Sequence, residues 1–420
     1  MKNKALRLIA LSVLAGSLLA AVCTSAAAAS LCVNPGGTKG CYKSIGAAVA
    51  AASPNDTINV SQGTYKEDVV IGKPLSLVGA GYSNTIIDAT GLSNGIYIDG
   101  LDNPGLSDVV VTGFTVRNAN FEGILVTNSS AVTVWANQAI NNDLALSIST
   151  GSCPGLPPFE TEEGFDCGEG IHLSGVDHST VANNVSTHNS GGLLISDDTG
   201  ATHDNLISGN VSQNNPFDCG IVLASHPPYQ GSSPYGVVRN TITNNQSIHN
   251  GYQVPGAGAG VGVFSGATGG SVSANVISYN QLLDNGLPGV AFHSHQPGDN
   301  LNDNVIVGNR ISGNGADEED ATTPGPTGIN VFGVSPITGT VISENVISKE
   351  AYQVVVNTPS EVDLHLNNFT DKTVGLDNIG AGTANATENW WGCSGGPGKS
   401  GCASASGAGL LVAPWLTRPF

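Results

Sequence analysis

The chain has 420 residues, of which 11% are charged and 5% aromatic, and 56 are glycine. So few charges exclude long solvated helices held by charge pairs, and the many glycines favour a fold with frequent turns. The formal net charge of −19 excludes nucleic acid and anionic membrane surfaces as partners, because both would repel the protein.

The N-terminus has the pattern of a secretory signal peptide. Lys2, Lys4 and Arg7 precede an apolar stretch over residues 8–22, and small residues follow at 27–29. We therefore expect a signal peptide over residues 1–29 and a secreted protein, extracellular or periplasmic. No other apolar run is long enough to span a bilayer, so no membrane partner is expected.

Export makes disulfides favourable. We expect two local pairs, each nine residues apart: Cys32–Cys41 and Cys393–Cys402. A third bond could join Cys167 to Cys153 or to Cys219. Cys167 and Cys219 stand at equivalent places two repeats apart, about 10 Å at the usual strand spacing, which is too far for a disulfide. We favour Cys153–Cys167, with Cys219 a buried free thiol.

The first mature segment, residues 30–94, is expected to form an N-terminal cap and the first coils. Residues 44–52 are an alanine-rich helical run, which ends at turn residues 53–56. Short strand-like runs follow at 57–60, 68–71, 75–78 and 85–88. A short helix before such strands suits the atypical end unit that a solenoid needs to cover its core.

Residues 95–380 repeat one phrase, and we expect 381–420 to close the stack. Glycine followed by alternating apolar residues starts at Gly95, Gly123, Gly170, Gly192, Gly220, Gly260, Gly289 and Gly328. A second phrase ends each time in asparagine, at Asn137, Asn184, Asn210, Asn245, Asn275, Asn309, Asn345 and Asn368. The spacing indicates coils of three short strands, that is, an all-β parallel β-helix solenoid of about ten coils with a short N-terminal capping helix. The asparagines are expected to form a structural column at one turn, where this residue tolerates a left-handed conformation and can bond to its equivalents.

Residues 45–81 resemble the N-terminal cap of secreted right-handed parallel β-helix proteins, the pectin-lyase-like superfamily. The segment from Asn389 to Gly392, with Gly396-Pro397 and Pro414-Trp415-Leu416, is similar to the closing segment of uncharacterised members. This resemblance implies a right-handed solenoid. The motifs of pectate lyases, pectin methylesterases, polygalacturonases and alginate epimerases are missing, so it supplies no catalytic residue.

If the glycine phrases stack in register, their outward residues form columns on the first sheet. These columns bring together six residues as acid/base candidates: His172, Asp197, Asp198, His226, His293 and His295. Imidazole beside carboxylate can perform acid/base chemistry or hold a divalent metal. An ordinary polar surface would leave the same pattern, and that alternative remains open.

Acidic residues just before the strands are weaker metal candidates, with calcium as the possible cofactor: Asp166, Glu169 and Asp218. They would equally suit strand-end caps. Two acidic runs, one at Glu160, Glu162 and Glu163 and one at residues 317–320, are each either a solvated loop or a weak calcium site. Loops at 151–168, 227–236, 251–259 and 314–327 are expected to form walls beside the first sheet.

Together these features predict a secreted, monomeric β-helix that binds polysaccharide along its first-sheet groove. As an enzyme it would be a carbohydrate-active lyase, glycoside hydrolase or epimerase. The alternative is a non-catalytic carbohydrate-binding or cell-surface structural protein.

Overall fold

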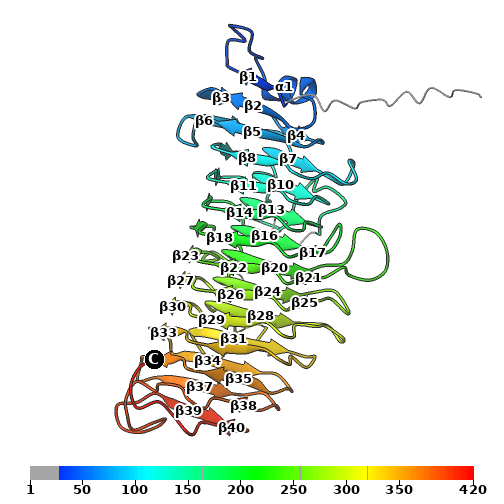
Figure 1. Ribbon diagram of the computed structural model, residues 1–420. Coiled ribbons are helices and arrows are strands. Elements are labelled where there is room, and N and C mark those ends of the chain that lie inside the picture. Colours follow the sequence, from blue (N-terminus) through cyan, green and yellow to red (C-terminus); the bar gives the residue numbers. More distant parts are fainter. Residues whose placement is uncertain (1–27, 162–163, 166, 255–257, 319) are drawn as a thin grey trace, which may run out of the picture.

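The computed structural model describes residues 28–161, 164–165, 167–254, 258–318 and 320–420. The predicted signal segment and Asp166 therefore fall wholly or partly outside the described residues. Described strands stack along one axis from the N-terminal to the C-terminal end, giving an elongated molecule (Figure 1). All named strands pair in parallel, each with its equivalents in neighbouring coils, and the fold is the predicted parallel β-helix.

Three long sheets form the walls of the helix. The 12-stranded sheet, which is the predicted first sheet, contains β4 (Val69–Ile71), β7 (Ile96–Asp99), β10 (Ile124–Thr127), β13 (Ile171–Ser174), β16 (Leu193–Ser196), β20 (Ile221–Ser225), β24 (Val261–Ser265), β28 (Val290–Ser294), β31 (Thr327–Gly333), β34 (Tyr352–Asn357), β37 (Val374–Asn378) and β39 (Ser404–Gly407).

The 14-stranded sheet contains β1 (Ser30–Val33), β2 (Asp56–Val60), β5 (Leu75–Gly79), β8 (Val110–Thr112), β11 (Thr133–Trp135), β14 (Thr180–Ala182), β18 (Leu206–Ser208), β22 (Thr241–Thr243), β26 (Val276–Ser278), β29 (Val305–Val307), β32 (Val341–Ser343), β35 (Val362–His365), β38 (Ala384–Asn385) and β40 (Leu410–Leu411).

The 11-stranded sheet contains β3 (Gly63–Tyr65), β6 (Thr85–Asp88), β9 (Thr115–Arg117), β12 (Gln138–Ile140), β15 (Val185–Thr187), β19 (Val211–Gln213), β23 (Gln246–Ile248), β27 (Gln281–Leu283), β30 (Arg310–Ser312), β33 (Val346–Ser348) and β36 (Asn368–Phe369). A small fourth sheet contains β17 (Thr202–His203), β21 (Val237–Val238) and β25 (Val272–Ser273).

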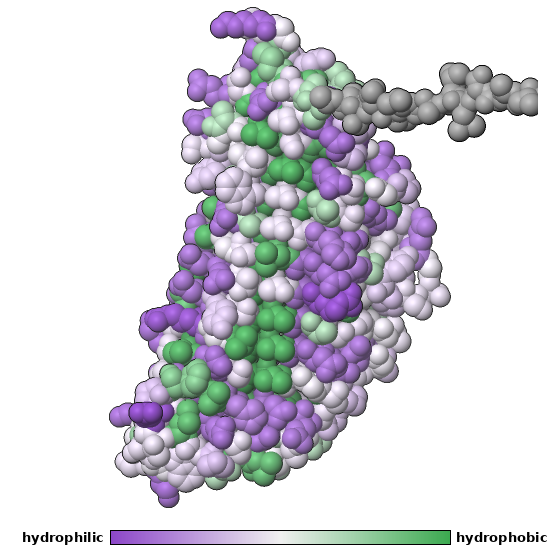
Figure 2. All heavy atoms as spheres, viewed as in Figure 1, coloured by the Kyte–Doolittle hydropathy of each residue, from purple (hydrophilic) through white to green (hydrophobic). Residues whose placement is uncertain are grey.

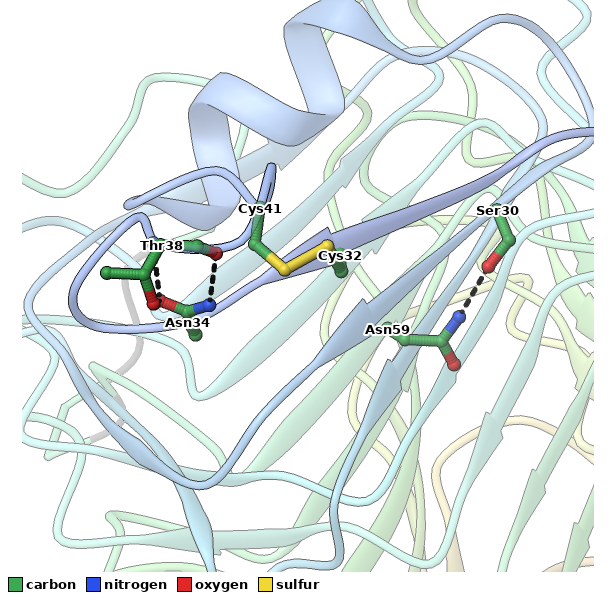
Figure 3. The surroundings of a disulfide bond; sticks show 6 residues. All are labelled: Ser30, Cys32, Asn34, Thr38, Cys41 and Asn59. Atoms are coloured by element: carbon green, nitrogen blue, oxygen red, sulfur yellow. Dashed lines mark hydrogen bonds between the residues drawn. A yellow bond between two sulfur atoms is a disulfide. The ribbon is translucent and has the colours of Figure 1, made fainter.

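The N-terminal end is covered by α1 (Ile45–Ala51), which buries Ile45, Ala48 and Val49. Ser44 caps this helix, and the Glu67 carboxylate accepts from the backbone N–H groups of Ile45 and Gly46, both at 2.8 Å. A carboxylate there satisfies helix N–H groups that have no partner within the helix. The cap is also cross-linked by Cys32–Cys41, beside the hydrogen-bonded turn from Asn34 to Thr38 (Figure 3).

The other expected disulfides, Cys153–Cys167 and Cys393–Cys402, are also present, and Cys219 is a buried free cysteine. No helix in the described residues is both long and apolar enough to cross a bilayer.

The core is a continuous column of inward-facing valine, isoleucine and leucine side chains. Most strands of the other two long sheets alternate buried and partly exposed residues, but every residue of β10, β13, β16 and β20 is buried. Loops therefore cover the outer face of the 12-stranded sheet along these strands. On the face seen in Figure 2, apolar residues reach the surface as a narrow band along the long axis, with hydrophilic residues on both sides.

Asparagines line the turns in three ladders rather than in the single column that was expected. The longest contains Asn137, Asn184, Asn210, Asn245, Asn280, Asn309, Asn345, Asn367 and Asn389. The predicted members Asn275 and Asn368 were wrong: Asn275 belongs to a second ladder, and the neighbouring Asn367 takes the place of Asn368. The left-handed conformation expected of the ladder asparagines is found instead at the residue before each of them, such as Asn183 at φ 54°.

Candidate functional site

The strand register confirms the two predicted columns that contain His172 and His293. His172 pairs with Leu125 and Leu194, and in the next column His293 pairs with Phe264 and Phe332. The six candidate residues nevertheless do not form one patch. Five of them divide into two clusters with the Phe264 ring between them, 6.3 Å from the His226 ring and 5.4 Å from the His295 ring, and Asp197 belongs to neither cluster.

The first group, named here the buried cluster, contains Glu122, Glu160, Glu169, His172, Asp198 and His226, which line a common cavity. His172 Nδ1 lies 3.2 Å from Glu122 Oε1, and its Nε2 lies 2.8 Å from Ser196 Oγ. Ser196 in turn donates to Asp198, whose two carboxylate oxygens lie 3.1 and 3.2 Å from His226 Nδ1. Polar contacts therefore connect both histidines across three coils.

The pKa values of the groups in this cluster are shifted in opposite directions. Burial raises the pKa of Glu160 to about 8, and the nearby Glu122 charge adds to the shift. Burial would also raise the pKa of Asp198, but His226 and His172 outweigh it and hold this pKa well below its usual range. The pKa of His172 is lowered by burial. Carboxyl groups separated in this way can divide the acid and base roles.

Asp197 is placed differently from its neighbour Asp198. Its carboxylate accepts from Ser225 Oγ at 2.9 Å and from the backbone N–H groups of His226 and Gly236 at 2.8 and 2.6 Å. Three donors in a buried place tie Asp197 to the turn after β20. This arrangement gives Asp197 a structural task, and its catalytic role remains a prediction.

A loop covers the buried cluster instead of forming a wall beside it. Thr161 donates to Asp198 Oδ1 from its backbone at 3.2 Å and from its hydroxyl at 2.5 Å. The Phe159 ring lies between Tyr97 and Tyr229, with centroids 6.3 and 6.2 Å away. The Cys153–Cys167 disulfide closes the same loop. As a result His172, Asp198 and His226 are at most 2% exposed, so none of them faces an open groove.

The second group, the His293–His295 cluster, includes Asp317 and Asp320. His293 Nε2 lies 2.6 Å from Asp317 Oδ2, while its Nδ1 lies 3.3 Å from His295 Nε2 and 3.9 Å from Asp320 Oδ2. His293, His295 and Asp320 each offer a ligand atom, all within 4.8 Å of one another. Burial and the neighbouring His293 lower the pKa of His295, which favours the neutral imidazole that binds metals.

A pocket of about 240 Å³ adjoins this cluster. Its floor is apolar, formed by outward residues of the 12-stranded sheet such as Val222 and Ala291, and its edge includes His293 and Asp320. The weak metal candidate Asp218 lines the same pocket, whereas Glu169 belongs to the buried cluster. Asp166 lies outside the described residues.

Two parts of these clusters were missed from the sequence. Glu122 precedes Gly123 in the same way that Glu169 precedes Gly170, and the Glu169 N–H donates to Glu122 Oε2 at 2.8 Å. This shared position could have indicated, from the sequence alone, that Glu122 lies next to Glu169. In contrast, the position of Asp317 and Asp320 near His293 depends on the path of a long loop, and no periodicity predicts such a path.

Among the similar solved structures, one with a TM-score above 0.5 supports the fold. The DFA-IIIase of Arthrobacter chlorophenolicus, solved in complex with GF2, is 12% identical with a TM-score of 0.51, over 88% of this chain and 86% of that one. The mannuronan C-5 epimerase A-module of Azotobacter vinelandii is 16% identical with a TM-score of 0.45, over 90% and 94% of the two chains. An alginate lyase from Paenibacillus sp. is 15% identical with a TM-score of 0.37, over 91% and 99%.

A comparison with curated proteins finds no match. The family model described as "Periplasmic copper-binding protein (NosD)" matches residues 40–259 and 158–330. These overlapping matches extend from the N-terminal cap through both clusters to β31. The chain therefore belongs to the NosD family of right-handed parallel β-helix proteins.

Proposed function

We propose that this protein is an exported copper-binding protein whose site is the His293–His295 cluster. The observation that carries the proposal is the convergence of His293, His295 and Asp320, whose ligand atoms lie within 4.8 Å of one another beside a pocket. The family description supplies copper as the metal to test first, and periplasmic as the compartment. Three disulfides are consistent with an oxidising compartment.

The histidine geometry favours a metal over a simple ion pair. The 3.3 Å between His293 Nδ1 and His295 Nε2 is about the separation of two nitrogens bound to one metal at roughly 2 Å. Asp317 contacts the opposite nitrogen of His293, and a carboxylate in that position fixes the ring and makes it a better ligand. Imidazole and carboxylate ligands suit Cu²⁺, so the site would store or present the oxidised ion.

Copper titration tests this site directly. Wild-type protein should bind one Cu²⁺ more than His295→Asn, and the nitrogen hyperfine splitting of that ion in the electron paramagnetic resonance spectrum should be missing in His295→Asn. His249→Asn is the matched control, because His249 lies on an exposed turn, stacked on Tyr252. An unchanged spectrum and affinity in His295→Asn would contradict the proposal.

Polysaccharide binding is a second candidate, favoured by a groove of about 460 Å³ on the 11-stranded sheet. The exposed Tyr82 ring stands beside Arg117, Gln138 and Asn141 there. An aromatic face with amide and guanidinium donors suits a sugar ring and its hydroxyl groups. In this candidate function the protein binds a glycan without catalysis. The glycan would lie on the 11-stranded sheet and not on the 12-stranded sheet, which loops cover.

A glycan array with Tyr82→Ala tests the binding candidate, and assays for reducing ends and unsaturated products test catalysis by the first-sheet residues. Binding that Tyr82→Ala abolishes, without turnover, would support the non-catalytic candidate. Turnover that is lost in His172→Asn would favour the lyase, hydrolase or epimerase prediction instead. Tyr279→Ala is the control, since Tyr279 is exposed but does not line the groove.

A further inference from the structure

The buried cluster has the composition and geometry of a second metal site. We propose that Glu122, Glu169, His172 and Glu160 bind one divalent first-row transition metal, separately from the His293–His295 cluster. The two sites share no ligand, so this proposal does not depend on copper binding at the other site.

Three of the ligands converge from adjacent coils of the rigid sheet. Glu122, Glu169 and His172 are 1–2% exposed, and each offers a ligand atom within 4.8 Å of the other two. The hydrogen bond from Glu169 N to Glu122 Oε2 fixes one carboxylate relative to the backbone of the next coil. Ligands held by paired strands lose little freedom when a metal binds, which favours affinity.

The fourth ligand comes from the covering loop. Glu160 lines the same cavity, and its buried Oε1 atom has no hydrogen-bond partner among the described residues. A buried carboxyl oxygen without a donor is costly unless it is protonated or bound to a cation. The raised pKa of Glu160, about 8 because of burial and the Glu122 charge, reflects that cost.

A layer of further contacts holds the histidine ligand in place. His172 directs Nδ1 toward Glu122, while its Nε2 contacts Ser196 Oγ at 2.8 Å. Ser196 is held by Asp198, and Asp198 by Thr161 and His226. Metal-binding histidines usually have such a partner on the opposite nitrogen, which sets the tautomer and the ring orientation.

The charge of the cavity favours a cation. Its described lining contains four acidic residues and two histidines, and neither lysine nor arginine. Buried carboxylates need a proton, a hydrogen bond or a metal to compensate them. A divalent ion in the cavity would supply that compensation to Glu160 Oε1, which has no hydrogen-bond partner among the described residues.

The ligand set also selects among metals. Three carboxylates and one imidazole suit Zn²⁺, Mn²⁺, Fe²⁺ or Co²⁺, whereas Cu⁺ prefers sulfur ligands. The sulfur atom that lines the cavity belongs to Cys167, which is in a disulfide. Calcium, the cofactor expected from the acidic residues alone, takes oxygen ligands and would leave His172 unused.

The experiment uses full-length mature protein with His295→Asn, so that the other site is silenced, and Co²⁺ as the visible probe. After removal of metal with a chelator, Co²⁺ uptake is measured by metal analysis and by visible absorption. We expect one Co²⁺ per chain, at least 10-fold weaker binding in Glu160→Gln, and a comparable loss in Glu122→Gln. Glu361→Gln, at an exposed position, should bind like the parent.

Both glutamine variants keep the size of the side chain and an acceptor oxygen, and thermal unfolding without metal confirms that they fold. No Co²⁺ bound by the folded parent would overturn the proposal, as would unchanged affinity in both variants. Failure of the copper proposal gives a different result: His295→Asn would then bind as much Cu²⁺ as the wild type.

Discussion

Glu350 ends a ladder of asparagines by accepting two hydrogen bonds from Asn314. Its Oε1 atom lies 3.0 Å from the backbone N and 3.1 Å from the side-chain Nδ2 of Asn314. In the preceding coils an asparagine Oδ1 occupies this place, as Asn314 itself does for Asn285. A carboxyl group has therefore replaced an amide at a buried position.

This replacement predicts a pH-dependent stability. Burial raises the pKa of Glu350 to about 7, despite the opposing hydrogen bonds from Asn314. Because the folded pKa exceeds the unfolded value of about 4.5, its contribution to stability is full below pH 4.5 and is lost as pH rises through 7. Glu350→Gln should therefore exceed wild type in free energy of unfolding by about 1–3 kcal/mol at pH 8 and match it at pH 4.

Urea unfolding of both proteins at the two pH values measures the difference. Glu361→Gln serves as the control for loss of a surface charge, and its effect should be within about 0.5 kcal/mol. A Glu350→Gln variant that is less stable than wild type at pH 8 would contradict the assignment.

The ladders predict large costs for single asparagine substitutions. Asn210 Oδ1 accepts from Asn184 N and Nδ2 at 3.0 Å, and its Nδ2 donates to Val181 O and to Asn245 Oδ1. Asn210→Ala leaves buried donors and acceptors without partners, so we expect a loss of about 3 kcal/mol or more in the free energy of unfolding. Chemical unfolding measures it, with Gln281→Ala on the exposed face of β27 as the matched control.

The sequence predicted the sheet register but not which asparagines share a ladder. Glycine phrases fix the register because a slip by one residue would expose the apolar side of each strand. Several neighbouring asparagines satisfy the same spacing, as Asn367 and Asn368 do, and only the turn conformation distinguishes them. Asn275 was misplaced for the same reason, since its coil holds another ladder asparagine at Asn280.

The candidate site was predicted in part. Outward columns correctly placed His172 and His293 on the 12-stranded sheet, because the side-chain period of a strand is two. The covering loops could not be predicted, since their paths follow contacts such as Thr161 with Asp198 and Asp317 with His293. These contacts convert an expected surface patch into one buried cluster and one cluster beside a pocket.

Asp317 allows a test of whether the orientation of the His293 ring matters for copper binding, because its substitution leaves the proposed ligands intact. Asp317→Asn removes the carboxylate 2.6 Å from His293 Nε2, so the ring loses the partner that fixes its tautomer. We expect Cu²⁺ affinity to fall about 10- to 100-fold, the usual cost of losing such a contact. Isothermal titration measures it, and Glu318→Gln, exposed in the same loop, should retain wild-type affinity.

The Cys153–Cys167 disulfide should decide whether solvent reaches the buried cluster. It closes the loop that carries Glu160 and Thr161, and these two residues line one cavity together with His172 and His226. Replacing both cysteines by serine lengthens the free loop, and by chain entropy it should cost up to about 3 kcal/mol of loop stability. Local opening then becomes more frequent while the sheets stay paired.

Diethylpyrocarbonate labelling with peptide mass spectrometry measures this opening. In wild type, His172 and His226 should label at least 10 times more slowly than the exposed His249, and in the double serine variant their rates should rise toward it. His249 is the internal control in both proteins, because it lies on a turn far from the loop in sequence and is exposed. Equal protection of His172 in the two proteins would show that the strand packing, rather than the cross-linked loop, keeps reagents from the cluster.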